Sequence, residues 1–232
     1  MAVFNGKFGD GKTVSNVVTF WNGPWVVDSE IGAGASIGDG AILRFCNLAE
    51  RTEVGRRNTL DHVKMDIGTY TGEFTIIKYA TVGKFCAISW NVSIGGANHD
   101  VARLALTPSH RILGEKTQEA YSSFKEQSCT IGNDVWLAAG VHVLRNVHVG
   151  DGAVIGANSV VTKDIPPYAI AVGSPAKVVG RRFPDELATK LLKIKWWNFP
   201  LDVLRGRCRA ILDRDLTAED VVELERIKAD LS

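Results

Sequence analysis

The feature that most constrains this chain is an aliphatic residue that recurs every six positions and is often followed by glycine. The longest unbroken run comprises Ile131, Leu137, Val143, Val149, Ile155 and Val161. A period of six fits neither the 3.6-residue repeat of a helix nor the two-residue alternation of a strand. It fits a solenoid of short flat faces, in which one aliphatic side chain per face points into the core.

Two looser runs extend the repeat toward the N-terminus. The first comprises Ile76, Val82, Ile88 and Ile94; the second comprises Ile31, Ile37 and Leu43, with Val54 and Leu60 following in a shifted phase. We expect these side chains to point into the same core. The pattern is weak over residues 61–75, which we interpret as a small excursion from the solenoid. The repeat as a whole predicts a mainly β domain over residues 1–183.

The largest break in the repeat lies between Ile94 and Ile131. We predict a long loop there, at about residues 96–128, extruded from the coil, and long loops in regular folds are commonly functional. The loop mixes apolar and basic side chains, which suits an acceptor-binding site, although each side chain also suits packing. They are Leu104, Leu106, Ile112, Leu113, Tyr121 and Phe124, with Arg103, Arg111, Lys116 and Lys125.

The sequence changes character near its C-terminus. Pro166 and Pro167 end the repeat, and residues 168–173 predict one irregular strand. From residue 184 the apolar residues follow a helical stripe, which Pro200 interrupts. Thr217 has the right chemistry to cap a last helix. We therefore expect a helical extension over residues 184–232.

Composition narrows the partners and the compartment. The chain has 27 Lys and Arg against 26 Asp and Glu, so no bulk charge favours nucleic acid or an anionic membrane. Its four cysteines include no CxxC pair, which indicates free thiols in a reducing compartment and no zinc knuckle. The sequence lacks an apolar run long enough for a membrane span or a secretory signal. We expect a cytoplasmic protein with no nucleic-acid, membrane or metal partner.

Five segments in order between residues 80 and 200 carry a family resemblance. They are ATVGKFCAIS at 80–89, ANHD at 97–100, IGNDVWLAAG at 131–140, IGANSVVTKDIPPYAIAVGSPAKVV at 155–179 and KWWNFP at 195–200. With them the chain resembles the hexapeptide-repeat acyltransferases, and among these the xenobiotic branch of chloramphenicol and streptogramin acetyltransferases. The resemblance implies a left-handed parallel β-helix, acetyl-CoA as acyl donor, antibiotic resistance as a role, and homotrimers with active sites between neighbouring subunits.

The resemblance also implies that His99, in the ANHD segment, is the catalytic base. The chemistry calls for such a group, because a hydroxyl that attacks a thioester must lose its proton as the new C–O bond forms. A neutral imidazole with an ordinary pKa near 6.5 suits that step at neutral pH. The four other histidines, at positions 62, 110, 142 and 148, lie outside the matching segment.

The acetyl-CoA site follows from the same resemblance. The small Ala139 and Ala157 would admit the pantetheine arm along the coil, and Thr162, Lys163 and Lys177 would meet the phosphates. Trp136 would line the groove or cap the coil. Backbone N–H groups of the small run 138–140 are candidates for oxyanion stabilisation, or merely turn a corner.

Three alternatives bear on function. If the protein is an enzyme, the presence of a catalytic base favours transfer to the hydroxyl of a small antibiotic or sugar-like acceptor. The alternative is N-acetylation of an amino sugar. A non-catalytic scaffold would need neither the loop nor the cations. A zinc-dependent lyase of the carbonic anhydrase type shares this solenoid, but its histidines are spaced differently from His142 and His148, and no third partner stands upstream.

Overall fold

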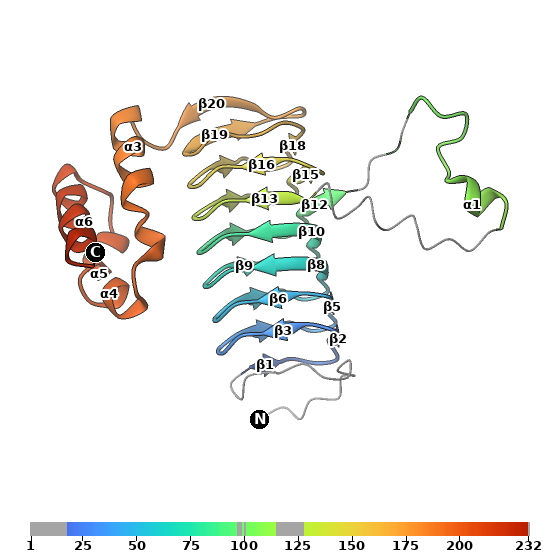
Figure 1. Cartoon of the computed structure of the whole chain (residues 1–232), viewed down its shortest axis with the longest axis horizontal. Helices are drawn as coiled ribbons and strands as arrows, with labels where there is room; N and C mark the ends of the chain where they lie inside the picture. Colours follow the sequence, from blue (N-terminus) through green and yellow to red (C-terminus); the bar gives the residue numbers. More distant parts are fainter. Residues whose placement is uncertain (1–17, 97–98, 100, 115–127, 232) are drawn as a thin grey trace. The chain divides into compact units, whose positions relative to one another are not determined.

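The computed structural model describes residues 18–96, 99, 101–114 and 128–231. The chain divides into two compact units, Met1–Gly180 and Arg181–Ser232. The first unit is the expected left-handed parallel β-helix, whose short strands stack coil upon coil (Figure 1). Among the described residues, no helix is both long and apolar enough to cross a membrane.

Each coil of the first unit contributes strands to three faces. The first face stacks β1 (Thr19–Phe20), β4 (Ser36–Ile37), β7 (Glu53–Val54), β9 (Tyr70–Thr71), β11 (Ala87–Ile88), β14 (Trp136–Leu137), β17 (Val154–Ile155), β19 (Ala169–Val172) and β20 (Lys177–Arg181). The second stacks β2 (Trp25–Val27), β5 (Ile42–Arg44), β8 (Thr59–Met65), β10 (Ile76–Val82), β12 (Ser93–Gly96), β15 (His142–Leu144) and β18 (Val160–Val161). The third stacks β3 (Glu30–Ile31), β6 (Asn47–Leu48), the ends of β8 and β10, β13 (Cys129–Ile131) and β16 (His148–Val149).

The core of the coil consists of the aliphatic residues of the repeat. All six members of the longest run are at most 1% exposed, so the prediction from the repeat is confirmed. The members of the looser runs are buried as well, with one exception. Ile76 was expected inside but is 44% exposed, and its neighbour Ile77 is fully buried in its place.

The misplacement of Ile76 has a simple geometric cause. In the N-terminal half of the coil the step from the second face to the third takes five residues, as from Leu43 to Leu48 and from Ile77 to Val82, which are all buried. Each coil there is therefore 17 residues long, and a strict period of six drifts out of register. The same short step accounts for the shifted phase that begins after Leu43.

Residues 61–75 are not an excursion. The seven-residue strand β8 runs through this region and pairs with β5, β6 and β10, so the coil continues without a break. The repeat is faint here because a threonine takes an aliphatic core position: Thr71 is 5% exposed, and its hydroxyl accepts a hydrogen bond from Asn58 Nδ2 at 2.7 Å. A buried hydroxyl with a partner carries little penalty.

The coil also continues past Val161. Val149 pairs with Ile165 in a parallel bridge, and β19 pairs in register with β17, followed by β20. The two prolines therefore do not end the stack, and the strand predicted over residues 168–173 is β19, which pairs regularly within it. Pro167 occupies a corner, where its missing N–H costs no ladder hydrogen bond.

The long insertion leaves and rejoins the coil at one corner. On one side Gly95, near the end of β12, lies against the backbone of Lys78, and on the other Cys129 opens β13 in register with Ala80 of β10. The described part of the insertion holds a short helix, α1 (Ser109–Ile112). Tyr121, Phe124, Lys116 and Lys125 lie outside the described residues.

The second unit is helical, as the sequence predicts. It contains α3 (Asp185–Ile194), the 3₁₀ turn η2 (Trp196–Asn198), α4 (Leu201–Arg205), α5 (Arg209–Leu212) and α6 (Ala218–Asp230). Pro200 breaks the helical run, and Thr217 caps α6 in a capping box with Asp220. Trp197, Leu191 and Ile227 are buried in its core.

Candidate active site

His99 lies just after the point where the insertion leaves the coil, and its side chain is exposed. Its ring Nδ1 lies 2.8 Å from the carbonyl oxygen of Leu106. A carbonyl oxygen can only accept, so Nδ1 must carry the proton that is donated. In the neutral imidazole the other nitrogen, Nε2, then holds the lone pair. The contact with Leu106 therefore selects the tautomer in which Nε2 can act as a base.

Two of the predicted cofactor residues form one bare corner between the first and second faces. Ala139 and Ala157 follow β14 and β17 on successive coils, and the Ala139 carbonyl accepts from the Asn158 N–H at 2.9 Å. Earlier coils carry larger side chains at this point, including Trp90, which is 58% exposed. Gly140 turns the corner with φ +70, where a Cβ would lie 2.3 Å from Asn158 Oδ1. The two alanines thus leave a smooth strip beside the second face.

The predicted hydroxyl and the first of the two predicted cations lie on the other side of the same face. Thr162 and Lys163 directly follow β18, and both are exposed. Lys177 belongs to the next level, because the preceding N–H, of Ala176, donates to the Val160 carbonyl at 2.8 Å. β18 pairs with β15, and β15 pairs with β12. The end of β18 is therefore stacked in line with the end of β12, where the insertion with His99 begins. The structure therefore places four of the six predicted cofactor residues at the two borders of the second face, and Lys177 opens β20 on the first face.

Trp136 lies apart from that group, on the first face. It is 52% exposed on β14 and pairs in register with Val154 of the next coil. Several other large apolar side chains on neighbouring coils are also exposed in the described chain. They are Tyr70 at 49%, Phe74 at 48%, Ile76 at 44% and Trp90 at 58%.

The backbone of residues 138–140 offers fewer free donors than the sequence suggests. The Ala138 N–H donates to the Ile155 carbonyl at 3.0 Å, and the Gly140 N–H donates to the Trp90 carbonyl at 3.1 Å. Both amides are committed to the stacking of coils and are unavailable to an oxyanion. Only the Ala139 N–H, of these three, makes no such bond within the described residues.

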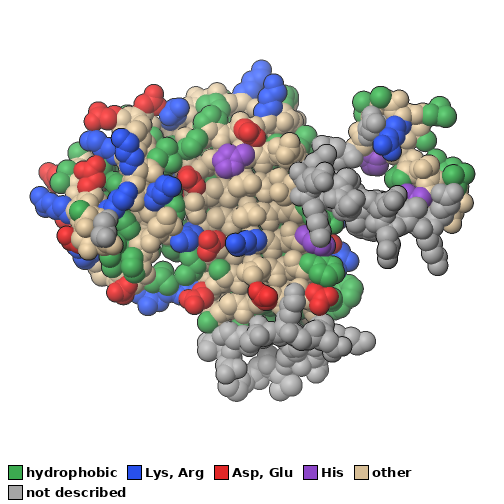
Figure 2. Space-filling view, in the orientation of Figure 1, with side chains coloured by type: hydrophobic (Ala, Val, Ile, Leu, Met, Phe, Trp, Pro, Cys, Tyr) green, Lys and Arg blue, Asp and Glu red, His purple; other side chains and the backbone are tan. Residues whose placement is uncertain are grey.

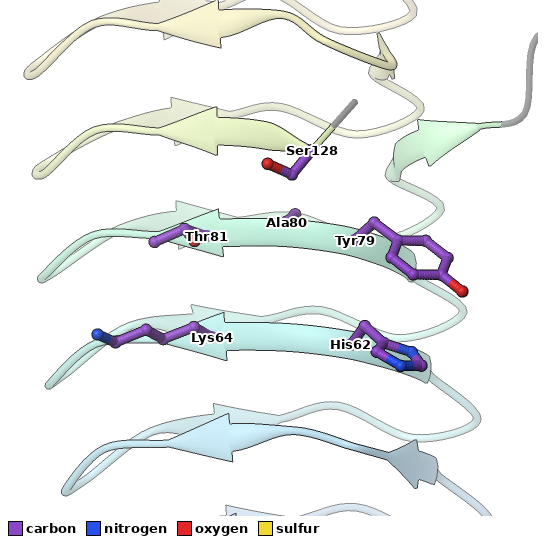
Figure 3. Close-up of a pocket in the computed structure, with 6 residues that line it drawn as sticks. All are labelled: His62, Lys64, Tyr79, Ala80, Thr81 and Ser128. Atoms are coloured by element: carbon purple, nitrogen blue, oxygen red, sulfur yellow. The ribbon is translucent and has the colours of Figure 1, made fainter. Parts of the chain in front are cut away.

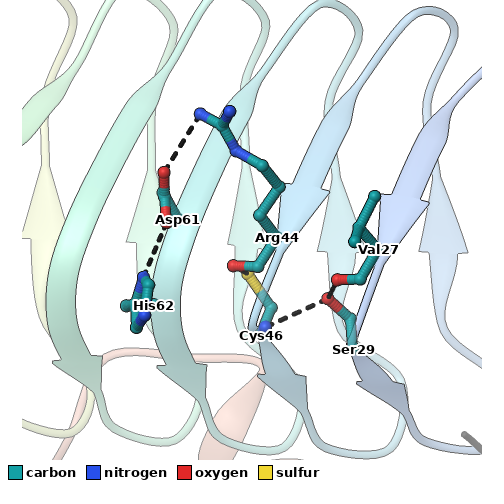
Figure 4. Close-up of polar contacts among 6 residues, drawn as sticks. All are labelled: Val27, Ser29, Arg44, Cys46, Asp61 and His62. Atoms are coloured by element: carbon teal, nitrogen blue, oxygen red, sulfur yellow. Dashed lines mark hydrogen bonds and ion pairs between the residues drawn. The ribbon is translucent and has the colours of Figure 1, made fainter. Parts of the chain in front are cut away.

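A second polar cluster was not identified from the sequence. Asp61 Oδ2 lies 3.0 Å from Arg44 Nη2, and Asp61 Oδ1 lies 2.7 Å from His62 Nδ1 (Figure 4). The His62 ring stacks on Tyr79, with centroids 4.7 Å apart and an interplanar angle of 15°. On its other side it contacts Phe45 at 4.6 Å. In the same view the Ser29 hydroxyl accepts from the Cys46 N–H at 3.0 Å.

This cluster has a sequence signal, which is a spacing of 17 rather than six. Asp28, Phe45, His62 and Tyr79 recur at that interval and all have positive φ, between 45° and 55°. They occupy the corner made by the five-residue step, where a left-handed residue shortens the turn. The stack of rings therefore follows from coil length, which a search for period six overlooks.

The remaining histidines stand apart from one another. His142 and His148 are exposed on the second and third faces of one coil, and His110 belongs to α1. Figure 2 shows the third face at the front of the coil, with a few charged side chains among atoms of other kinds. No group of three potential metal ligands occurs within the described ranges.

Comparison with known proteins gives a consistent result. Residues 128–163 match the family described as bacterial transferase hexapeptide (six repeats). A chloramphenicol acetyltransferase of Morganella morganii is 40% identical over 129 residues, which are 53% of this chain and 61% of that protein. The chain thus matches less than two thirds of that relative's length. A probable macrolide acetyltransferase of Lysinibacillus sphaericus is 42% identical over 124 residues, 51% of this chain and 68% of that protein.

A solved structure extends the likeness of fold. The polysialic acid O-acetyltransferase OatWY superposes with a TM-score of 0.51 at 19% identity, over 78% of this chain and 87% of that one. The six-residue aliphatic repeat on which this β-helix is built is the feature named in the description of the matching transferase family. With the relatives above, this chain belongs to the bacterial hexapeptide-repeat acetyltransferase family.

Proposed function

We propose that the protein is an acetyl-CoA-dependent acetyltransferase that acetylates a hydroxyl of a small antibiotic or sugar-like acceptor, with His99 as general base. The observation that carries the proposal is the 2.8 Å contact between His99 Nδ1 and the Leu106 carbonyl. It leaves Nε2 as the basic nitrogen on an exposed ring in the loop. The relatives named as chloramphenicol and macrolide acetyltransferases support the reaction class.

In the proposed reaction His99 Nε2 takes the proton of the acceptor hydroxyl as its oxygen attacks the thioester carbonyl of acetyl-CoA. The tetrahedral intermediate then collapses, the C–S bond breaks, and the leaving thiolate takes that proton back from the imidazolium. The Leu106 carbonyl stabilises the imidazolium, because it accepts from Nδ1 in both protonation states. The Ala139 N–H is the candidate donor to the oxyanion.

The coil has the features that an acetyl-CoA site requires. The strip formed by Ala139 and Ala157 leaves space for a slender chain along the stacked coils. Lys163 and Lys177 present exposed ammonium groups on adjacent levels, suited to phosphate oxygens, with the Thr162 hydroxyl as an additional donor. Trp136 is on the adjoining face, so its proposed role is to border the strip.

We propose a homotrimer with active sites between neighbouring subunits. In support, the coil exposes a set of large apolar side chains, and the described part of the insertion exposes more. An interface between subunits would remove these side chains from water. Those of the insertion are Val101 at 86%, Leu104 at 107%, Leu106 at 58%, Ile112 at 59% and Leu113 at 66%. Sedimentation tests this directly: a monomer that turns over acetyl-CoA would contradict the shared site.

Release of free thiol from acetyl-CoA tests the activity. The acceptor panel comprises chloramphenicol, a streptogramin A compound, amino sugars and simple phosphonates. His99→Ala is expected to lower kcat by roughly 10²–10⁴, the usual contribution of a general base. His110→Ala, in α1 of the same insertion, is the matched control. Turnover that survives His99→Ala would contradict the assigned base, and the absence of turnover with every acceptor would leave the scaffold alternative.

The product separates the two kinds of acetyl transfer. An acetyl ester is cleaved by neutral hydroxylamine, whereas an acetamide resists it. We expect a hydroxylamine-sensitive product. A resistant product made from an amino sugar would replace O-acetylation by N-acetylation.

A further inference from the structure

A pocket lies beneath both ends of the insertion, away from the bare strip. Its volume is about 200 Å³, and its lining residues are His62, Lys64, Tyr79, Ala80, Thr81 and Ser128. We call it the corner pocket. In Figure 3 the rings of His62 and Tyr79 stand at one end, Lys64 and Thr81 at the other, and Ser128 on the coil above. Ala80, which is 4% exposed, carries only a methyl group between them.

The corner pocket adjoins the base of the insertion. Ser128 is the residue before β13, where the chain rejoins the coil. Gly95, where the chain leaves the coil, packs so tightly on Lys78 that a Cβ would lie 1.9 Å from its carbonyl oxygen, one residue from Tyr79. A molecule in the pocket would therefore lie next to both ends of the segment that carries His99.

The end of the pocket with the rings is held rigidly. Tyr79 is stacked on His62 on one side, and the Arg145 guanidinium lies 5.6 Å from its centroid on the other. Arg145 donates to the Gly95 carbonyl at 3.3 Å and is only 6% exposed. Asp61 fixes the His62 ring through Nδ1, which leaves Nε2 as the nitrogen that can meet a ligand.

The charges around the corner pocket are mainly positive. Among the described residues of the pocket and its adjoining corner, the cations are Arg44, Lys64, Lys78 and Arg145, and the carboxylates are Asp61 and, farther along the same corner, Asp28. Both oxygens of the Asp61 carboxylate are engaged, one by Arg44 and one by His62. The remaining field attracts anions. The hydroxyls of Thr81 and Ser128 can also donate to an oxyanion.

We infer that the corner pocket binds the anionic group, a carboxylate or a phosphate, of the acceptor molecule. This inference rests on the proposed function, because it assigns the acceptor a negative charge and a second point of attachment besides its reacting hydroxyl. Lys64 supplies the charge, His62 Nε2 and the two hydroxyls supply hydrogen bonds, and the Tyr79 ring borders the carbon skeleton.

Binding is tested without turnover by NMR of the His62 ring in the full chain at pH 7.5. The probes are D-glucuronate, inorganic phosphate and, as the neutral match, D-glucose. Glucuronate and phosphate are expected to shift the His62 signals saturably, and glucose is not. Lys64→Gln is expected to weaken glucuronate binding about tenfold, as for loss of a charge-assisted hydrogen bond. Lys190→Gln, which removes the same charge from α3, is expected to change nothing.

The outcomes distinguish the sources of the anion and the two proposals. A shift with phosphate but not glucuronate would identify a site for free inorganic anions and overturn the acceptor assignment. No saturable shift with either anion, or equal weakening by Lys64→Gln and Lys190→Gln, would overturn the site itself. Binding of glucuronate in a protein that releases no thiol with any acceptor would support the site and refute the acetyltransferase. In an active enzyme we expect KM for glucuronate about tenfold below that for glucose, and Lys64→Gln to abolish that difference.

Discussion

Gly95 touches the carbonyl oxygen of Lys78 so closely that even one methyl group would not fit, since a Cβ would lie 1.9 Å from that oxygen. Two coils meet there backbone to backbone, at the corner from which the insertion leaves. The Gly95 carbonyl also accepts from Arg145, whose guanidinium lies 5.6 Å from the centroid of the Tyr79 ring. Gly95 thus lies where two coils stack, next to the corner pocket, and at the start of the segment with His99.

We expect Gly95→Ala to destabilise the coil by more than about 2 kcal/mol, because a left-handed backbone at φ +78 is strained for alanine and the methyl group overlaps backbone. Gly23→Ala is the matched control: its φ is +65, but open space surrounds its Cβ. The control is expected to cost about 1 kcal/mol from the backbone alone. Chemical denaturation measures both, and equal losses would mean that the coils relax around the methyl group.

Filling the bare strip should block acetyl-CoA without unfolding the coil. Ala157→Trp places a large side chain at an exposed corner, in the position that Trp90 occupies two coils earlier. We expect KM for acetyl-CoA to rise at least about tenfold while the thermal unfolding midpoint changes little. Arg56→Trp, at the same corner near the N-terminus, is the control and should leave KM unchanged. An unchanged KM in Ala157→Trp would remove the strip from the donor site.

The two exposed lysines should act on the donor's phosphates and not on the chemical step. Lys163→Gln and Lys177→Gln are each expected to raise KM for acetyl-CoA about three- to tenfold and to leave kcat unchanged, since solvent screens both contacts. Steady-state kinetics at two salt concentrations test this, because the wild-type KM should rise with salt more steeply than that of either variant. A fall in kcat at constant KM would contradict the assignment.

The buried thiols should make the coil sensitive to alkali. Burial raises the pKa of Cys86 to about 12 and that of Cys46 to about 11, from an ordinary value of 9.0. A raised pKa in the folded state contributes stability that is complete below pH 9 and is lost as the pH rises toward 12. Cys86→Ala should therefore flatten the loss of unfolding free energy above pH 9. An unchanged alkaline slope in urea titrations would argue against this cause.

The last helix should depend on its cap. The Thr217 hydroxyl accepts from the Asp220 N–H, and the Asp220 carboxylate accepts from the Thr217 N–H at 2.8 Å. We expect Thr217→Ala to cost about 1 kcal/mol and Thr217→Ser to cost little. The Thr217 hydroxyl also donates to the Asp220 carboxylate at 2.7 Å. This hydrogen bond, together with the one from the Thr217 N–H, holds the pKa of Asp220 below its ordinary value, so their contribution is present at neutral pH and is lost as acid protonates the carboxylate. Helical content measured by circular dichroism, with denaturation, follows both effects.

The sequence predicted the coil, the site of the insertion and the helical tail, because each is written as a local pattern. Ile76 was misassigned because of the length of the coil, and residues 61–75 were misinterpreted as an excursion because Thr71 takes an aliphatic core position there. A five-residue step at a left-handed corner makes the upstream coil 17 residues long, and the period of six cannot register that. The stack of Phe45, His62 and Tyr79 was overlooked for the same reason.

The candidate site was predicted unevenly. His99 came from a short motif, but the partner that selects its tautomer, Leu106, is a backbone carbonyl and carries no sequence signal. Ala139 and Ala157 meet because stacking places equivalent residues of successive coils side by side. The Asp61–His62 pair could not be inferred from the chemistry of neighbouring residues alone, since adjacent side chains meet only where the corner bends the chain.

The insertion begins and ends at a single corner, so the coil before it and the coil after it pair with each other as though nothing stood between them. The other turns must have a length that keeps successive strands stacked. The length and composition of the insertion are free of that requirement. A segment that keeps His99 could therefore differ in length and in its other side chains and still leave the stack of coils intact. In the proposed enzyme, such an exchange would change the acceptor without changing the coil that carries Ala139, Ala157 and Lys163.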